Sequence, residues 1–154
     1  MQIKEILNSK RAEELEKLIG NNYGVSCSLK GFAVIITHED KIWITTKEAS
    51  ELVNSSLNVN SIGMYIGKLK RGDKINLGIE GVQMFAKNAT KNFVTVDEKT
   101  MKEFMMGYSI GSFEKANCEM DNFVLVKHKD DFIGVGVFKG SNVENLLPKS
   151  RRIY

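Results

Sequence analysis

The sequence predicts an α+β protein built on antiparallel sheets. Three pairs of β-rich runs, over residues 31–46, 62–79 and 123–138, are each joined by a short polar turn. Two runs joined so closely form a hairpin. Helical patterns fall between the hairpins instead of alternating with single strands, which indicates an α+β class. A chain of 154 residues forms one domain or two small ones that share an interface.

The first helix is predicted over residues 9–19. Apolar residues recur there at helical spacing, with three glutamates set between them. Ser9 is a suitable N-cap, and Gly20 is a natural residue just beyond the C-terminus. Residues 1–7 fit either a strand or a lead-in turn.

The first hairpin is predicted from strands at 31–37 and 41–46, with a polar turn at 38–40. Thr45 and Glu48 have the spacing of a capping box, which predicts a short helix over 47–53. The polar run 54–61 ends this element.

The second hairpin is predicted from residues 62–70 and 75–79, joined by a turn at 71–74. Glycines within the first of these runs suggest a bulge or close packing. A short helix over 80–86 follows. The chain before residue 91 is therefore expected to hold four strands and about three helices.

The last third begins with a strand at 93–96 and a helix at 98–106 capped by Asp97. Met101, Phe104 and Met105 share one apolar face, which predicts core positions and leaves Met106 as the exception. A third hairpin joins 123–127 to 132–138. Its Gly134 and Gly136 lie on one strand face, where we expect another backbone to approach closely.

Several functional classes are excluded by pattern. No run approaches the ~18 apolar residues of a membrane span, and residues 1–10 lack the apolar core of a secretory signal, so a cytoplasmic protein is expected. Cys27 and Cys118 stand 91 positions apart, which favours two reduced, buried thiols over a zinc site or a disulfide. No cofactor or metal is predicted.

No catalytic constellation is visible either. The phosphate-binding patterns GxxxxGK[ST] and GxGxxG are absent in the context they require. His38 and His128 lie at hairpin edges, where a solvent-facing role is more common than a catalytic one. The acidic pairs at 39–40 and 130–131 are typical of turns.

Basic residues cluster in two places on a chain of net charge +3. Residues 68–91 hold six basic and two acidic side chains, a local charge of +4, and the last six residues carry three positive charges and no acid. Such a cluster is usually a solvated face. Tyr65, Tyr108 and Tyr154 could stack on unpaired bases, and guanidinium groups bind phosphate bidentately, which puts RNA binding somewhat ahead of a protein-interaction role.

The run from Phe93-Val-Thr-Val through the helix at 98–106 to Ile133-Gly-Val-Gly-Val resembles a PUA domain, an RNA-binding pseudo-barrel. The closing Asn145-Leu-Leu-Pro-Lys-Ser-Arg-Arg-Ile is similar to the PUA-type tail of Sun-family RNA cytosine-5 methyltransferases. The segments 62–70 and 75–79 are similar to a pre-PUA domain of two-domain ribosome-biogenesis proteins. The resemblance implies a pre-PUA α+β domain at 1–91 and a PUA β pseudo-barrel at 92–154.

The same resemblance implies an RNA surface at the loop 107–110 and the terminal segment. Together with the basic clusters, it predicts these RNA-binding residues: Lys68, Lys70, Arg71, Lys87, Lys91, Gly107, Tyr108, Lys149, Arg151 and Arg152. The chain departs from the methyltransferases because neither cysteine follows a proline and no room remains for a Rossmann-like cofactor domain. An enzyme is therefore not expected.

The functional hypothesis is non-catalytic binding of structured rRNA or tRNA in ribosome biogenesis or RNA modification. Positive side chains would engage phosphates, and Tyr108 would contact the backbone or an exposed base. The alternative is a protein-docking adaptor in a ribosome-assembly or RNA-modification complex. A PUA-like enzyme or small-ligand pocket ranks third, and neither a membrane nor DNA is expected as a partner.

Overall fold

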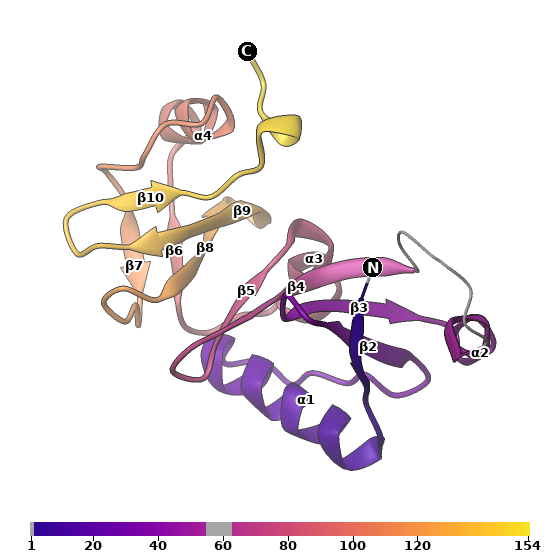
Figure 1. Cartoon of the computed structure of the whole chain (residues 1–154). Helices are drawn as coiled ribbons and strands as arrows, with labels where there is room; N and C mark the ends of the chain where they lie inside the picture. Colours follow the sequence, from indigo (N-terminus) through magenta and orange to yellow (C-terminus); the bar gives the residue numbers. More distant parts are fainter. Residues whose placement is uncertain (1, 55–62) are drawn as a thin grey trace.

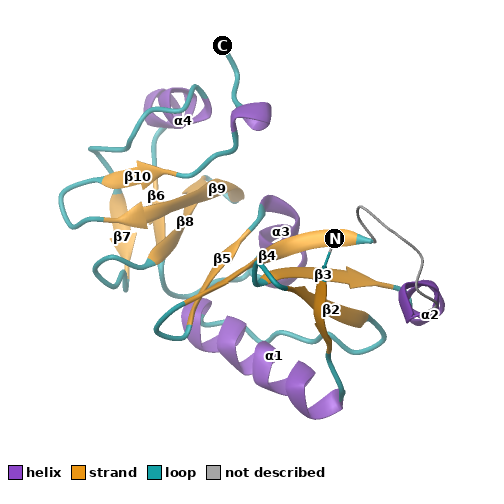
Figure 2. Ribbon diagram, in the orientation of Figure 1, coloured by secondary structure: helices purple, strands orange, loops and turns teal. Residues whose placement is uncertain are grey.

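The computed structural model describes residues 2–54 and 63–154, which form two five-stranded sheets (Figures 1 and 2). The first sheet has the order β1-β2-β3-β4-β5 and is antiparallel throughout. Its strands are β1 Ile3–Ile6, β2 Ala33–Thr37, β3 Lys41–Thr45, β4 Met64–Lys70 and β5 Lys74–Leu77. The helices of this half are α1 Ser9–Tyr23, α2 Lys47–Asn54 and α3 Ile79–Phe85.

The second sheet has the order β10-β9-β8-β6-β7. Its strands are β6 Phe93–Thr95, β7 Glu114–Ala116, β8 Phe123–His128, β9 Asp131–Phe138 and β10 Val143–Asn145. Helix α4 Glu98–Met105 follows β6, and a 3-10 turn, η1 Lys149–Arg151, precedes the C-terminus. Strands β6 and β8 are parallel, whereas every other pair in this sheet is antiparallel. The predicted α+β class is confirmed.

Helix α1 is one turn longer than the sequence predicts. It begins after Asn8, whose side chain accepts a hydrogen bond from the Arg11 amide at 2.9 Å, so Asn8 and not Ser9 is the N-cap. It ends at Gly24, which is left-handed with φ 64°. Gly20 lies inside the helix, where a Cβ would stand 2.8 Å from the Val25 carbonyl oxygen. Gly20 therefore allows the Val25 backbone to come close to the helix and does not end the helix.

The predicted hairpins are confirmed, with small shifts at their ends. Residues 3–6 form a strand paired with β2, which decides between the two readings of the N-terminus. The residue that caps α2 is Thr46 instead of Thr45, because its hydroxyl accepts from the Ala49 amide at 3.1 Å. The expectations for residues 54–62 fall largely outside the described residues, because 55–62 are not described.

The sequence missed the two outer strands of the second sheet, β7 and β10. Both have three residues and little apolar content, so neither carries a strand pattern of its own. Strand β10 explains Gly136, where a Cβ would lie 2.5 Å from the Glu144 carbonyl oxygen. At Gly134 the close neighbour is the Phe104 ring of α4 instead of backbone.

Two hydrophobic clusters hold the fold together. The smaller one joins α4 to the second sheet through Phe104, with Met101 and Met105 packed partly against it. Met106 is 44% exposed, as predicted. The larger cluster lies between α1 and the first sheet but also includes Leu125, Phe132 and Val135 of β8 and β9. The two sheets therefore share a core, and the division into domains at 91 and 92 stays a prediction.

Candidate nucleic-acid interface

The loop after α4 is fixed by backbone geometry. Asp97 caps the helix by accepting a hydrogen bond from the Thr100 amide at 2.8 Å, and this bond lowers the pKa of the Asp97 carboxyl. After Met105 the chain turns at Gly107, whose φ of 104° disfavours any residue with a side chain. The amide of Tyr108 then donates to the Glu103 carbonyl at 3.1 Å. The Tyr108 side chain is left 63% exposed beside the turn.

The C-terminal segment is hydrogen-bonded to this loop and to the end of α4. Asn145, at the end of β10, donates from Nδ2 to the carbonyl oxygens of Phe104 and Tyr108, both at 2.8 Å. Its Oδ1 accepts from the Leu147 amide at 2.7 Å, and the Ile153 amide donates to the Met105 carbonyl at 2.8 Å. The segment after β10 therefore runs beside the end of α4 (Figure 1).

Arg152 lies directly against the loop glycine. A Cβ added at Gly107 would stand 2.9 Å from Cδ and Nε of Arg152, so a residue with a side chain there would displace the Arg152 guanidinium. Nε of Arg152 donates to the Leu147 carbonyl at 3.1 Å. That bond uses one donor of the guanidinium, and within residues 2–54 and 63–154 its two terminal nitrogens have no hydrogen-bond partner.

Arg151 points to the other half of the molecule. Its Nη2 forms an ion pair with Oε1 of Glu80 on α3, and both side chains are partly exposed. An anion that binds Arg151 would compete with this carboxylate. Lys149, in η1, is exposed.

The structure thus brings together five of the ten predicted residues, which we call the terminal surface: Gly107, Tyr108, Lys149, Arg151 and Arg152. The other five lie elsewhere. Lys70 and Arg71 are at the β4–β5 turn, which lies beside the end of α1, where the Asn22 side chain donates to the Asp73 carbonyl at 2.9 Å. Lys91 forms an ion pair with Glu119 and its amide donates to the Tyr23 carbonyl at the end of α1.

Lys68 and Lys87 complete the predicted set. Lys68 is half-buried on β4, and Lys87 is exposed after α3. The residue that sequence reasoning missed is Asn145, which holds the loop and the tail together. Its signal was present, because asparagine commonly bonds the backbone two residues on, as Asn145 does with Leu147.

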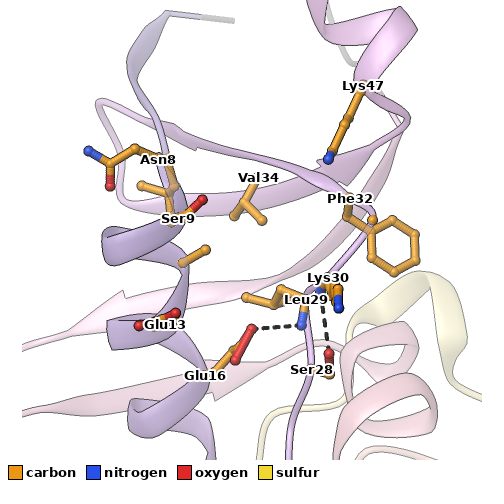
Figure 3. A pocket seen from close by; sticks show the side chains of 13 residues that line it. Asn8, Ser9, Glu13, Glu16, Ser28, Leu29, Lys30, Phe32, Val34 and Lys47 are labelled. Carbon is orange, nitrogen blue, oxygen red and sulfur yellow. Dashed lines mark hydrogen bonds between the residues drawn. The ribbon is translucent and has the colours of Figure 1, made fainter.

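A cleft of about 470 Å³ lies between the start of α1 and residues 28–32 (Figure 3). It holds none of the predicted residues. Glu16, on its wall, accepts a hydrogen bond from the Leu29 amide at 3.1 Å and so fixes the neighbouring loop. Within 2–54 and 63–154, no group of three or more His, Cys, Asp or Glu side chains is placed to hold a metal ion.

The cysteines and histidines differ slightly from expectation. Cys27 and Cys118 are free thiols but half-buried instead of buried, and desolvation with the nearby Glu16 carboxylate raises the pKa of Cys27 to about 11. His38 is exposed, as predicted. His128 is half-buried, with Nδ1 3.0 Å from the Val96 carbonyl oxygen, so it helps fix the end of β6. None of the helices in the described ranges is long and apolar enough to cross a membrane.

Two solved structures with the same arrangement are PUA-domain proteins. A conserved PUA domain protein from Thermoplasma acidophilum aligns with a TM-score of 0.62 at 14% identity, over 96% of both chains. The chain has the PUA-protein fold. A PUA domain from Aeropyrum pernix K1, solved as a tartrate complex, aligns with a TM-score of 0.58 at 12% identity, over 98% of this chain and 90% of that one. Both alignments take in the two sheets.

No protein-family model matches the sequence. Among curated proteins, the chain is similar to a ribosomal RNA small subunit methyltransferase F from Aeromonas salmonicida (strain A449), with 26% identity over 144 residues. The match covers 93% of this chain but only 28% of that protein's length. The resemblances to PUA proteins and to an RNA methyltransferase predicted from sequence are both confirmed.

Proposed function

We propose that this chain binds structured RNA, rRNA or tRNA, through the terminal surface, without catalysing a reaction itself. The observation that carries the proposal is the placement of Arg152 against Gly107 and beside the exposed Tyr108, with terminal nitrogens that no described residue engages. A guanidinium fixed at Nε is preorganised for a phosphate, and an exposed tyrosine offers a stacking face. The likeness to PUA proteins and to an rRNA methyltransferase supports RNA as the ligand class.

The proposed setting is ribosome biogenesis or RNA modification in the cytoplasm. The chain matches 28% of the methyltransferase's length, so methyl transfer is not part of the proposal. RNA would be held mainly by phosphate contacts, which position the ligand without reading its sequence. Binding should therefore weaken as salt rises, because neutralised phosphates release counterions.

The test compares two charge-neutralised triple variants. Lys149→Gln/Arg151→Gln/Arg152→Gln removes the positive charge of the terminal surface. The control, Lys10→Gln/Lys17→Gln/Lys30→Gln, removes as much charge from exposed residues on and near α1, in the other half of Figure 1. Affinity for fragmented rRNA and total tRNA is measured from 50 to 300 mM KCl.

We expect the terminal variant to lose about 100-fold in affinity at low salt and to reduce the slope of log K against log salt by about 2. The control should change affinity less than three-fold. Equal losses in both variants would indicate non-specific attraction and would overturn the proposal, as would salt-independent binding.

A protein-docking adaptor remains the second candidate, favoured by apolar side chains around the same surface. Met106 is 44% exposed, Leu146 37% and Ile153 61%. Exposed apolar groups gathered beside a polar rim are typical of interaction sites. Neutralising the terminal surface would leave such docking intact, whereas Met106→Ser/Ile153→Ser would weaken it and spare RNA affinity.

A further inference from the structure

A second cleft, of about 110 Å³, lies where the two sheets meet. Tyr65 of β4 and Asn76 of β5 line it from the first sheet. Val135 of β9 and the segment 146–148, which follows β10, line it from the other side. We propose that this cleft receives one unpaired nucleobase of the bound RNA, stacked on Tyr65 and hydrogen-bonded by the Asn76 amide. The inference rests on the proposed function and names which part of the RNA enters the protein.

Strand register places the chemistry of the cleft on one sheet face. Trp43 pairs with Tyr65, and Lys68 pairs with Asn76. A bulge in β4 between those pairs keeps Tyr65 on the same face as Lys68. The apolar residues on the opposite face of these strands, such as Ile42 and Ile75, belong to the core under α1. The face that carries Tyr65 is therefore the one turned away from α1.

The Tyr65 ring is held in place before any ligand arrives. It meets Trp43 edge to face, with ring centroids 5.5 Å apart and an interplanar angle of 61°. On another side it packs against Gly78, where a Cβ would stand 3.3 Å from the ring. A fixed ring can stack on a base at little entropic cost. Partial burial also raises the pKa of the Tyr65 phenol, so the ring stays neutral at physiological pH.

The Asn76 amide supplies recognition in the cleft. Its side chain is partly exposed, and no hydrogen-bond partner for it is found among the residues that the structure describes. An amide presents one acceptor and two donors, which match the donor and acceptor edges of a base. Two further lining residues, Val135 and Leu147, are buried and apolar. Apolar faces with one polar edge suit a planar heterocycle.

Charge complementarity favours RNA over a free small molecule or a protein segment. Lys68 lies beside Asn76 in the sheet, and Lys149 directly follows Pro148 at the rim. Cations on both sides fit the phosphates that flank a base in a polynucleotide. The volume is also well below the ~300–1,000 Å³ of drug-sized ligand pockets, so one ring system is the appropriate occupant. Through Lys149 the cleft adjoins the terminal surface.

The test uses two RNA hairpins of the same stem, one fully paired and one with a single unpaired 2-aminopurine. For the wild type, we expect about ten-fold tighter binding of the hairpin with the unpaired base, and quenching of its fluorescence by stacking. Tyr65→Leu and Asn76→Ala should each remove most of this preference and leave affinity for the paired hairpin unchanged. Circular dichroism and thermal unfolding confirm that both variants remain folded.

The matched control is Tyr108→Leu, which removes the exposed tyrosine of the terminal surface. It should weaken both hairpins alike and keep the preference between them. The inference would be overturned if the wild type bound the two hairpins equally well, or if the preference survived in Tyr65→Leu and Asn76→Ala. Either result would leave the proposal of RNA binding by the terminal surface unaffected. Failure of the wild type to bind either hairpin would instead overturn the proposed function.

Discussion

At the scale of single residues, the proposed interface depends on a glycine and an arginine that occupy each other's space. Gly107 has φ 104° and lacks the Cβ that would collide with Arg152. Arg152 in turn is bonded through Nε to the Leu147 carbonyl. The position of one charged group therefore follows from the conformation of a residue 45 places earlier in the chain.

Gly107→Ala should test this dependence. We expect it to destabilise the fold by about 1–3 kcal/mol, because alanine is strained at this φ and its methyl group displaces the Arg152 guanidinium. Urea unfolding measures the change in free energy, and RNA affinity should fall with it. Gly111→Ala is the control, since nothing lies within 4 Å of a Cβ there. Equal effects of the two changes would contradict the proposed role of Gly107.

At the scale of elements, α4 and the segment after β10 form one unit through the Asn145 side chain. Its amide nitrogen donates to the carbonyl oxygens of Phe104 in α4 and of Tyr108 in the loop, and its amide oxygen accepts from the Leu147 amide. The loop and the tail are thus ordered together, although 37 residues separate Tyr108 from Asn145.

Two substitutions at Asn145 separate its donor and acceptor roles. Asn145→Ala should destabilise the fold by about 2 kcal/mol through lost hydrogen bonds. Asn145→Asp keeps an acceptor for Leu147 but turns a negative oxygen toward two carbonyls, so we expect a larger loss. Chemical denaturation gives both values, and hydrogen exchange at the Leu147 amide should quicken more in Asn145→Ala. A milder effect of aspartate than of alanine would show that the two donor bonds matter little.

At the scale of the whole molecule, the two sheets are joined by shared packing. Phe132 of β9 is 6% exposed and belongs to the same cluster as the core residues of α1 and the first sheet. Buried Asn92 adds a polar connection, because its Nδ2 donates to the Asn22 carbonyl at 2.6 Å. These contacts fix the cleft between the sheets and the distance between the basic regions.

Phe132→Ala should reveal how strongly the sheets depend on each other. Trp43 is the sole tryptophan and lies in the first sheet, so its fluorescence reports unfolding of that sheet. We expect the free energy of unfolding reported by Trp43 to fall by about 3–5 kcal/mol, as for other large core truncations. This fall is expected although the substituted residue lies in the second sheet. Tyr154→Ala, at a side chain that is 92% exposed, should change nothing. An unchanged Trp43 transition in Phe132→Ala would favour independently folding domains at 1–91 and 92–154.

The sequence by itself determined the class, the hairpins, the apolar face of α4 and the Asp97 cap, because these depend on periodicity and on neighbours within a few residues. It misplaced the end of α1, since Gly20 and Gly24 both fit the local rule that a glycine follows the end of a helix. Only the close approach of Val25 to Gly20 distinguishes them. Strands β7 and β10 were invisible because pairing partners, not their own residues, make them strands.

The ten predicted residues were chosen for charge, ring or glycine character, and sequence could not say which of them meet. Tertiary structure decided that, by bringing Gly107 to Arg152, and it also paired Arg151 with Glu80, which is not among the ten. It also placed Tyr65 and Asn76 beside the segment 146–148, in a cleft that no local sequence pattern predicts. Contacts between residues far apart in sequence follow from the packing of whole sheets, because a side chain's surroundings are set by the elements that enclose it.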